Sequence, residues 1–104
     1  MGNHRDRLDI IADILSVISE RARKTQIMYR ANLSYGLLIK YLSEVGQSYL
    51  ARFERSENRY VLTPKGEEFL ERYREYLKRN RHVEKHIDDV NSRKKALEEL
   101  CSSC

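Results

Sequence analysis

The chain has 104 residues, which suits one domain with a modest core and at most one further projecting element. Hydrophobic residues make up 40% of it and charged residues 35%, and no apolar run approaches the roughly 20 residues of a membrane span. The formal net charge is +4, and the charged stretch from Arg5 onward leaves no room for a secretory leader, so we expect a cytoplasmic protein.

Residues 5–20 carry the pattern of a helix with two apolar stripes. The first stripe consists of Leu8, Ile11, Leu15 and Ile18. The second stripe, on a different face, consists of Ile10, Ile14 and Val17. Because a helix that is apolar on two sides is covered on two sides, we expect it to lie between the domain core and a second surface, such as a partner subunit.

Two short helices joined by a tight turn are predicted next. Thr25 is expected to cap the first, over residues 26–31, and Asn32 or Ser34 to cap the second. Gly46 is expected to end the second helix in the left-handed conformation. The side chains of that helix expected to pack inward are Leu38, Tyr41, Leu42 and Val45. Those expected to face away from the core are Tyr35, Gly36, Ile39 and Lys40.

This helix-turn-helix region contains no acidic residue between Glu20 and Glu44. Its five basic residues are Arg21, Arg23, Lys24, Arg30 and Lys40. A local patch of one sign indicates a polyanionic partner more strongly than overall charge does. A helix that enters the major groove passes phosphates on both sides, where a carboxylate would be repelled. Such a charge run alone is more often a solvated face, and it favours DNA binding only together with the turn, the hairpin and the resemblance described below.

A β-hairpin is predicted from two short β-prone runs at residues 48–54 and 59–63, which the turn sequence RSEN separates. It presents Arg52, Arg55 and Arg59.

A long helix is then predicted to begin at Pro64, with Thr63 as its N-cap, and to run to about Leu100. Its apolar positions recur in alternating steps of four and three, which is a heptad repeat. The predicted dimerisation positions are Phe69, Tyr73, Tyr76, Asn80, Val83, Ile87, Val90, Lys94 and Leu97, and the repeat continues through Cys101 and Cys104. Such a helix is roughly 55 Å long, longer than a small domain is wide, so we expect part of it to project and to pair with a second copy.

The orientation of that pair follows from Lys94. A parallel pair would set Lys94 against Lys94, whereas an antiparallel pair centred near residue 85 would set it beside Tyr76. We therefore expect an antiparallel homodimer. The alternative is a kinked helix that folds back on its own domain, for which the sequence supplies no break.

Two segments, ARKTQIMYRANLSY at residues 22–35 and YVLTPKGEEFLE at residues 60–71, resemble the archaeal 10a-type small DNA-binding proteins. The resemblance implies a mainly α protein with a small β-hairpin. It would comprise a winged helix-turn-helix domain over residues 5–63, a long helix over residues 64–100 that forms an antiparallel coiled-coil dimer, and a cysteine-containing tail at 101–104. It also implies binding of duplex DNA with little sequence preference.

The residues expected to contact DNA are Arg23, Lys24, Arg30, Ser34, Tyr35, Lys40, Arg52, Arg55 and Arg59. The basic side chains would bind phosphates, and Ser34 and Tyr35, at the start of the third helix, can bond phosphates or base edges. The face lacks the Arg, Asn and Gln side chains that usually read bases, so phosphate contacts should dominate. Tyr29 and Tyr41 are expected to pack in the protein core or in a groove and not to stack on unpaired bases. For Tyr35 both alternatives remain open.

The remaining motifs do not predict a metal, cofactor or catalytic site. His82 and His86 lie four residues apart, but two ligands off the seam favour solvated side chains over a metal site. Cys101 and Cys104 lack a second pair for zinc, which leaves a disulfide, as in hyperthermophiles, or no role. No cofactor is expected. The chain shows no Ser/His/Asp grouping and no glycine-rich phosphate loop, so we expect no enzyme.

Two functional hypotheses remain. The first is a homodimeric, chromosome-associated protein that binds double-stranded DNA and acts as a chromatin protein or a transcriptional regulator. The alternative is a winged-helix scaffold that binds proteins and not DNA. Titration of duplex DNA at two salt concentrations separates them, because phosphate binding weakens steeply with salt.

Overall fold

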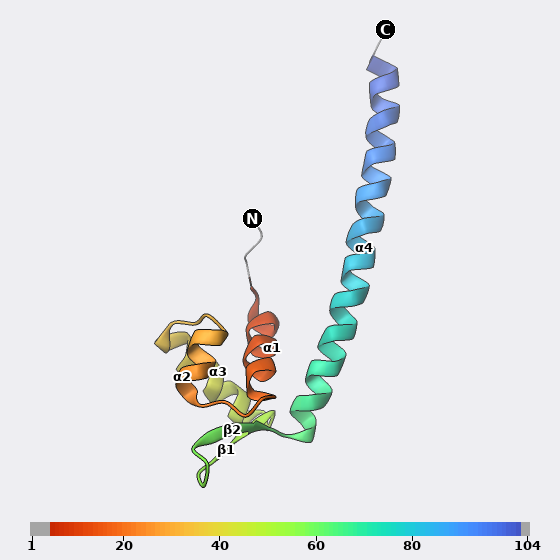
Figure 1. Cartoon of the computed structure of the whole chain (residues 1–104). Helices are drawn as coiled ribbons and strands as arrows, with labels where there is room; N and C mark the ends of the chain where they lie inside the picture. The colour runs from red at the N-terminus through yellow and green to blue at the C-terminus, as the bar shows by residue number, and fades with distance from the viewer. Residues whose placement is uncertain (1–4, 103–104) are drawn as a thin grey trace. The chain divides into compact units, whose positions relative to one another are not determined.

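The computed structural model describes residues 5–102 (Figure 1). Its elements are α1 (Arg7–Ile18), α2 (Lys24–Arg30), α3 (Tyr35–Gln47), β1 (Ala51–Glu54), β2 (Arg59–Leu62) and α4 (Pro64–Ser102). The chain forms two compact units, one that ends at Tyr73 and one that begins at Arg74, so α4 contributes to both. This arrangement confirms the predicted class, a mainly helical winged helix-turn-helix with a small hairpin and a long C-terminal helix. No helix among residues 5–102 combines the length and apolar content that a membrane crossing requires.

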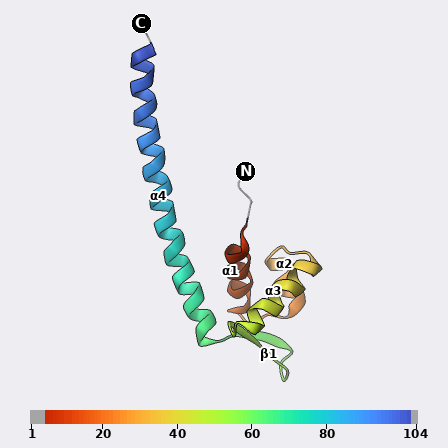
Figure 2. The same ribbon diagram turned by 180° about the vertical axis from the view of Figure 1, so that it is seen from behind.

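In the first unit, α1, α2 and α3 gather into one bundle, and the β1–β2 hairpin lies along one end of it, with its turn reaching beyond the helices (Figures 1 and 2). Helix α1 contacts α2, α3 and β2. The largest fully buried side chains are Ile14, Leu15, Ile18, Ile27, Leu38 and Val45. The core of the unit therefore forms where α1 meets the helix-turn-helix.

Helix α1 begins at Arg7, two residues later than predicted, because Asp6 and Asp9 form a capping box. Both of its apolar stripes are buried by the chain itself, apart from Leu8, whose exposed fraction is 43%. Both sides of α1 are therefore covered, as expected, but by its own unit, so the partner subunit suggested for the second side is not needed. The reason is that residues of the same small unit pack against both faces of α1, so Ile10 and Val17 of the second stripe belong to the core.

Thr25 does not cap α2. The helix begins two residues earlier than predicted, at Lys24, because the side chain of Gln26 reaches back and accepts a hydrogen bond from the Arg23 N–H at 2.8 Å. Asn32 turns the chain in the left-handed conformation at φ 54°. Ser34 then caps α3, as one of the two predictions had it, by accepting from the Leu37 N–H at 3.3 Å.

Gly46 does not end α3 either. The helix runs on to Gln47, and Tyr49 is the residue that turns left-handed, at φ 59°. The Leu50 N–H donates to the Val45 carbonyl at 3.0 Å and the Tyr49 N–H to the Gly46 carbonyl at 3.1 Å, which is the hydrogen-bond pattern of a Schellman motif. Leu50 and Val45 are both buried, so their packing decides where the helix ends, at the expense of a non-glycine left-handed residue.

The hairpin pairs β1 with β2 antiparallel, and Phe53 lies opposite Tyr60. Thr63 links the hairpin to α4: its hydroxyl donates to the Tyr49 carbonyl at 2.6 Å and accepts from the Gly66 N–H at 3.0 Å, which confirms the predicted cap. Gly66 is required by space, since a Cβ there would lie 2.0 Å from the Leu50 carbonyl oxygen.

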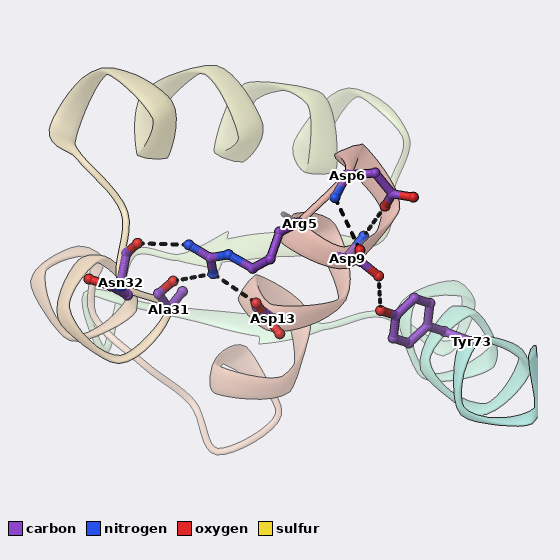
Figure 3. Close-up of polar contacts among 7 residues, drawn as sticks. All are labelled: Arg5, Asp6, Asp9, Asp13, Ala31, Asn32 and Tyr73. Atoms are coloured by element: carbon purple, nitrogen blue, oxygen red, sulfur yellow. Dashed lines mark hydrogen bonds and ion pairs between the residues drawn. The ribbon is translucent and has the colours of Figure 1, made fainter. Parts of the chain in front are cut away.

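Polar contacts link α1 to its neighbours on two sides (Figure 3). The guanidinium of Arg5 donates to Asp13 at 2.8 Å, to the Ala31 carbonyl at 2.6 Å and to the Asn32 carbonyl at 2.9 Å, and so ties α1 to the end of α2. On the other side of α1, the Tyr73 hydroxyl from α4 donates to Asp9. Carbonyls that follow a helix end are thereby satisfied by a side chain.

Candidate nucleic-acid interface

Lys24 and Tyr35, the first residues of α2 and α3, come together at the surface. The Lys24 ammonium lies 3.5 Å from the Tyr35 hydroxyl oxygen and 5.2 Å from the centre of its ring. Tyr35 remains 62% exposed, so the cation and the ring are both open to a partner. Ser34 adjoins them, and its hydroxyl can still donate because its capping role uses only the oxygen as acceptor.

The rest of the α3 outer face matches the prediction. Tyr41 is buried, whereas Lys40 is exposed and holds its ammonium 5.3 Å from the Tyr41 ring. A Cβ at Gly36 would meet nothing within 4 Å, so the backbone of the first turn is open to close approach. The exposed part of α3 thus presents the Lys40 cation, the Tyr35 ring and the open backbone at Gly36. Tyr29 is 77% exposed and so does not pack in the core of its own unit, whereas its packing in a groove stays a prediction.

Ion pairs neutralise the carboxylates that border the acid-free region. Arg30 binds Glu20 at 2.5 Å, and Glu44 binds Arg7 at 2.6 Å. Arg30, predicted to contact phosphate, thus already has an anionic partner and does not join the Lys24–Tyr35 cluster. These pairs join segments distant in sequence, and no local signal in the chain indicates them.

The hairpin arginines fall into two kinds. Arg52 pairs with Glu54 at 3.1 Å along the same strand, and Glu57 in the turn pairs with Arg21 at 3.0 Å, which ties the hairpin turn to the segment before α2. Arg55 and Arg59 form no ion pair with any residue in the range 5–102. Because they need not give up a partner, Arg55 and Arg59 are the hairpin cations best placed to bind phosphate.

A cleft of about 460 Å³ lies between the start of α2 and the hairpin. Its lining residues are Arg23, Lys24, Thr25, Phe53, Asn58 and Tyr60. The sequence predicted Arg23 and Lys24 as contacts but missed the aromatic wall, because alternation along the strands does not reveal that Phe53 and Tyr60 face the start of α2.

Helix α4 is unbroken from Pro64 to Ser102, and ion pairs four residues apart, such as Arg93–Asp89 at 3.1 Å, support it in water. Phe69 and Tyr73 pack against the winged-helix core of their own chain, so this part of the predicted seam already has a partner. The large apolar side chains further along α4 that are exposed are Tyr76, Val83, Ile87, Val90, Leu97 and Leu100.

The remaining candidates add no site. His82, His86 and Cys101 are exposed, and residues 5–102 contain no group of three side chains that could hold a metal ion. Cys104 lies outside the described residues, so the prediction for the cysteine pair stays untested.

Comparisons with known proteins agree with this geometry. A family model described as winged helix-turn-helix matches residues 4–81. The uncharacterized protein MJ0290 of Methanocaldococcus jannaschii is 35% identical over 75 residues, which span 71% of this chain but only 35% of that protein. The crystal structure of Sso10a-2, a DNA-binding protein from Sulfolobus solfataricus, is similar with a TM-score of 0.77 and 22% identity, and the match covers 85% of this chain and 95% of that one. The resemblance to the archaeal 10a-type proteins is thus confirmed at the level of the fold.

Proposed function

The chain belongs to the winged helix-turn-helix family, and on that premise we propose that it binds duplex DNA as a homodimer, through α3 and the hairpin. The observation that carries the proposal is the Lys24–Tyr35 cluster, which lies beside the exposed face of a helix that has no acidic residue before Glu44. The bordering carboxylates are held by arginines, which lowers the repulsion that an approaching phosphate would meet.

In this proposal α3 lies in the major groove, whose width of about 12 Å admits a helix. Ser34 and Tyr35 face the backbone or base edges at the start of the helix. Arg23, Lys24 and Lys40 bind phosphates on either side, and Arg55 and Arg59 bind phosphates from the hairpin. Arg30 and Arg52 contribute less, since each would first have to leave a carboxylate. Because phosphates carry no sequence information, the preference for particular sequences is weak.

The exposed apolar stripe of α4 supports the homodimer. Val83, Ile87 and Val90 recur at heptad spacing on a helix that is otherwise charged, and a second copy would remove them from water. In an antiparallel pair Lys94 lies beside Tyr76 of the other copy, which avoids the like-charge contact of a parallel pair. Phe69 and Tyr73 serve their own core, so the seam begins at Tyr76.

The dimer also defines the biological role that we propose. An antiparallel coiled coil would hold two DNA-binding units at opposite ends, and this arrangement suits bridging of separate duplexes or of distant segments of one chromosome. A chromatin protein that organises the chromosome fits that geometry better than a regulator of one operator, whose half-sites lie about 34–36 Å apart.

The proposal is tested by fluorescence anisotropy with a labelled duplex. Lys24→Glu and Lys40→Glu should each weaken binding at least about tenfold, because each removes a phosphate contact and adds a repelling carboxylate. Lys78→Glu is the matched control: it makes the same charge change on the exposed outer side of α4, far along the chain from α3, and should change the affinity little. If the wild-type protein binds no duplex even at low salt, the interaction-scaffold hypothesis replaces this one.

A further inference from the structure

Phe53 and Tyr60 form an aromatic pair on the face of the hairpin that turns toward the helices. They lie opposite each other on β1 and β2, with ring centres 5.0 Å apart and planes inclined by 62°. Phe53 nevertheless remains 44% exposed, although neighbouring Ala51 on the same strand face is buried. Tyr60 is half-buried and packs against the core, whereas Phe53 is left open, so packing of the domain does not account for the Phe53 ring.

The open side of the pair is the cleft of about 460 Å³ at the start of α2. The wall opposite the rings consists of Arg23, Lys24 and Thr25, and Asn58 from the hairpin turn lines it too. No carboxylate is among the lining residues. A second cleft, of about 450 Å³, adjoins the same two rings on the side of Tyr49, so the pair is accessible from more than one direction.

A cleft with an aromatic wall and a cationic wall matches the chemistry of a nucleotide, which combines a flat base with a phosphate. The volume also lies in the range of about 300–1,000 Å³ that is typical of ligand clefts. In a duplex the faces of the bases are stacked on one another, and only edges are available in the grooves. An unpaired nucleotide, by contrast, offers the face of its base to an aromatic side chain.

We propose that this cleft binds an unpaired nucleotide of single-stranded DNA, with the base against Phe53 and Tyr60 and the phosphate at Arg23 and Lys24. The Asn58 side chain, which is exposed at the rim of the cleft, supplies a hydrogen-bond donor or acceptor to the base edge. The protein would then bind single strands through the rings and duplexes through α3. Lys24 is common to both surfaces, so a junction between duplex and single strand can be held across them.

The test compares two probes on the full-length protein, a labelled oligothymidine and a labelled duplex, by fluorescence anisotropy. Phe53→Leu keeps an apolar side chain but removes the ring. It should weaken oligothymidine binding at least about fivefold, the lower end of what loss of base stacking costs, and leave duplex binding unchanged. Phe53→Tyr should restore single-strand binding. Tyr29→Leu removes another exposed ring, outside the cleft, and should leave the oligothymidine affinity unchanged.

A second measurement does not depend on any variant. Photocrosslinking of an oligonucleotide that carries iododeoxyuridine, followed by mass spectrometry, should place the crosslink on Phe53 or Tyr60. Crosslinks confined to Tyr29 or Tyr35, or equal oligothymidine affinity for wild type and Phe53→Leu, would overturn the proposal. Duplex binding without oligothymidine binding would reject this inference and leave the proposed function intact, whereas the reverse result would reject only the proposed function.

Discussion

Asp9 holds two hydrogen-bond donors at once. One carboxylate oxygen accepts from the Asp6 N–H at 3.0 Å and caps α1, and the other accepts from the Tyr73 hydroxyl of α4 (Figure 3). The bond from Tyr73, followed by the bonds from Asp6, lowers the pKa of Asp9. The pKa of Tyr73 is raised, first by burial and then by Asp9. One carboxylate therefore joins the start of α1 to Tyr73 in the third turn of α4.

Tyr73→Phe removes the donor while the ring remains. At neutral pH it should lower the free energy of unfolding by about 1–2 kcal/mol, as expected for a hydrogen bond to a charged acceptor. Because the folded pKa of Asp9 lies below its ordinary value of 3.8, the stabilisation is full above that pH and is lost as pH falls through the folded pKa. Urea unfolding of both proteins at neutral and strongly acidic pH measures the difference, which should shrink in acid.

Tyr29→Phe is the matched control, since it removes the hydroxyl of an exposed tyrosine that has no such bond and should leave stability unchanged at either pH. A loss for Tyr73→Phe that is the same at neutral and acidic pH would contradict the role of the ionised Asp9.

At the scale of elements, Gly46 and Gly66 differ in whether the surrounding structure leaves room for a side chain, and the sequence does not reveal this difference. Gly66 lies in the first turn of α4, where a Cβ would meet the Leu50 carbonyl oxygen at 2.0 Å. Gly46 lies inside α3 in ordinary helical conformation, and a Cβ there would meet nothing within 4 Å.

Gly66→Ala should therefore destabilise the protein by about 1–3 kcal/mol, because backbone would have to move to relieve the contact. Gly46→Ala should stabilise it by up to about 1 kcal/mol, because alanine loses less backbone entropy in a helix. Thermal unfolding followed by circular dichroism measures both. A fall in Tm for Gly46→Ala would restore the rejected view that this glycine ends the helix.

The features that could be predicted from the sequence are those that residues close together in the chain determine. Ser34 and Thr63 cap their helices by accepting from N–H groups three positions away, and the unbroken heptad pattern predicted α4. The predictions failed where a tertiary contact decides: buried Leu50 and Val45 end α3, and the same unit covers both sides of α1. The pairing of Arg30 with Glu20 likewise has no signature along the chain, and a DNA contact by Arg30 stays a prediction.

At the scale of the whole molecule, the proposed dimer makes a distance prediction. In an antiparallel pair centred near residue 85, a spin label at Lys95→Cys lies level with residue 75 of the other copy. The two labels are then separated by about 30 Å along the axis, at 1.5 Å per residue. In a parallel pair the labels lie at the same height and are separated only by the width of the coiled coil. Pulsed electron paramagnetic resonance, on a protein in which Cys101 and Cys104 are replaced by serine, measures this distance and distinguishes the antiparallel from the parallel pair. A monomeric mass in sedimentation experiments would reject both kinds of dimer.

The central claim is that paired winged-helix units bind duplex DNA chiefly through phosphates, and the salt dependence of wild-type binding tests it most directly. Arg23, Lys24, Lys40, Arg55 and Arg59 would displace condensed counterions, so the logarithm of affinity for one unit should fall with the logarithm of salt concentration with a slope of about −4 to −5. Affinity that changes little with salt, or a slope near zero, would contradict the account.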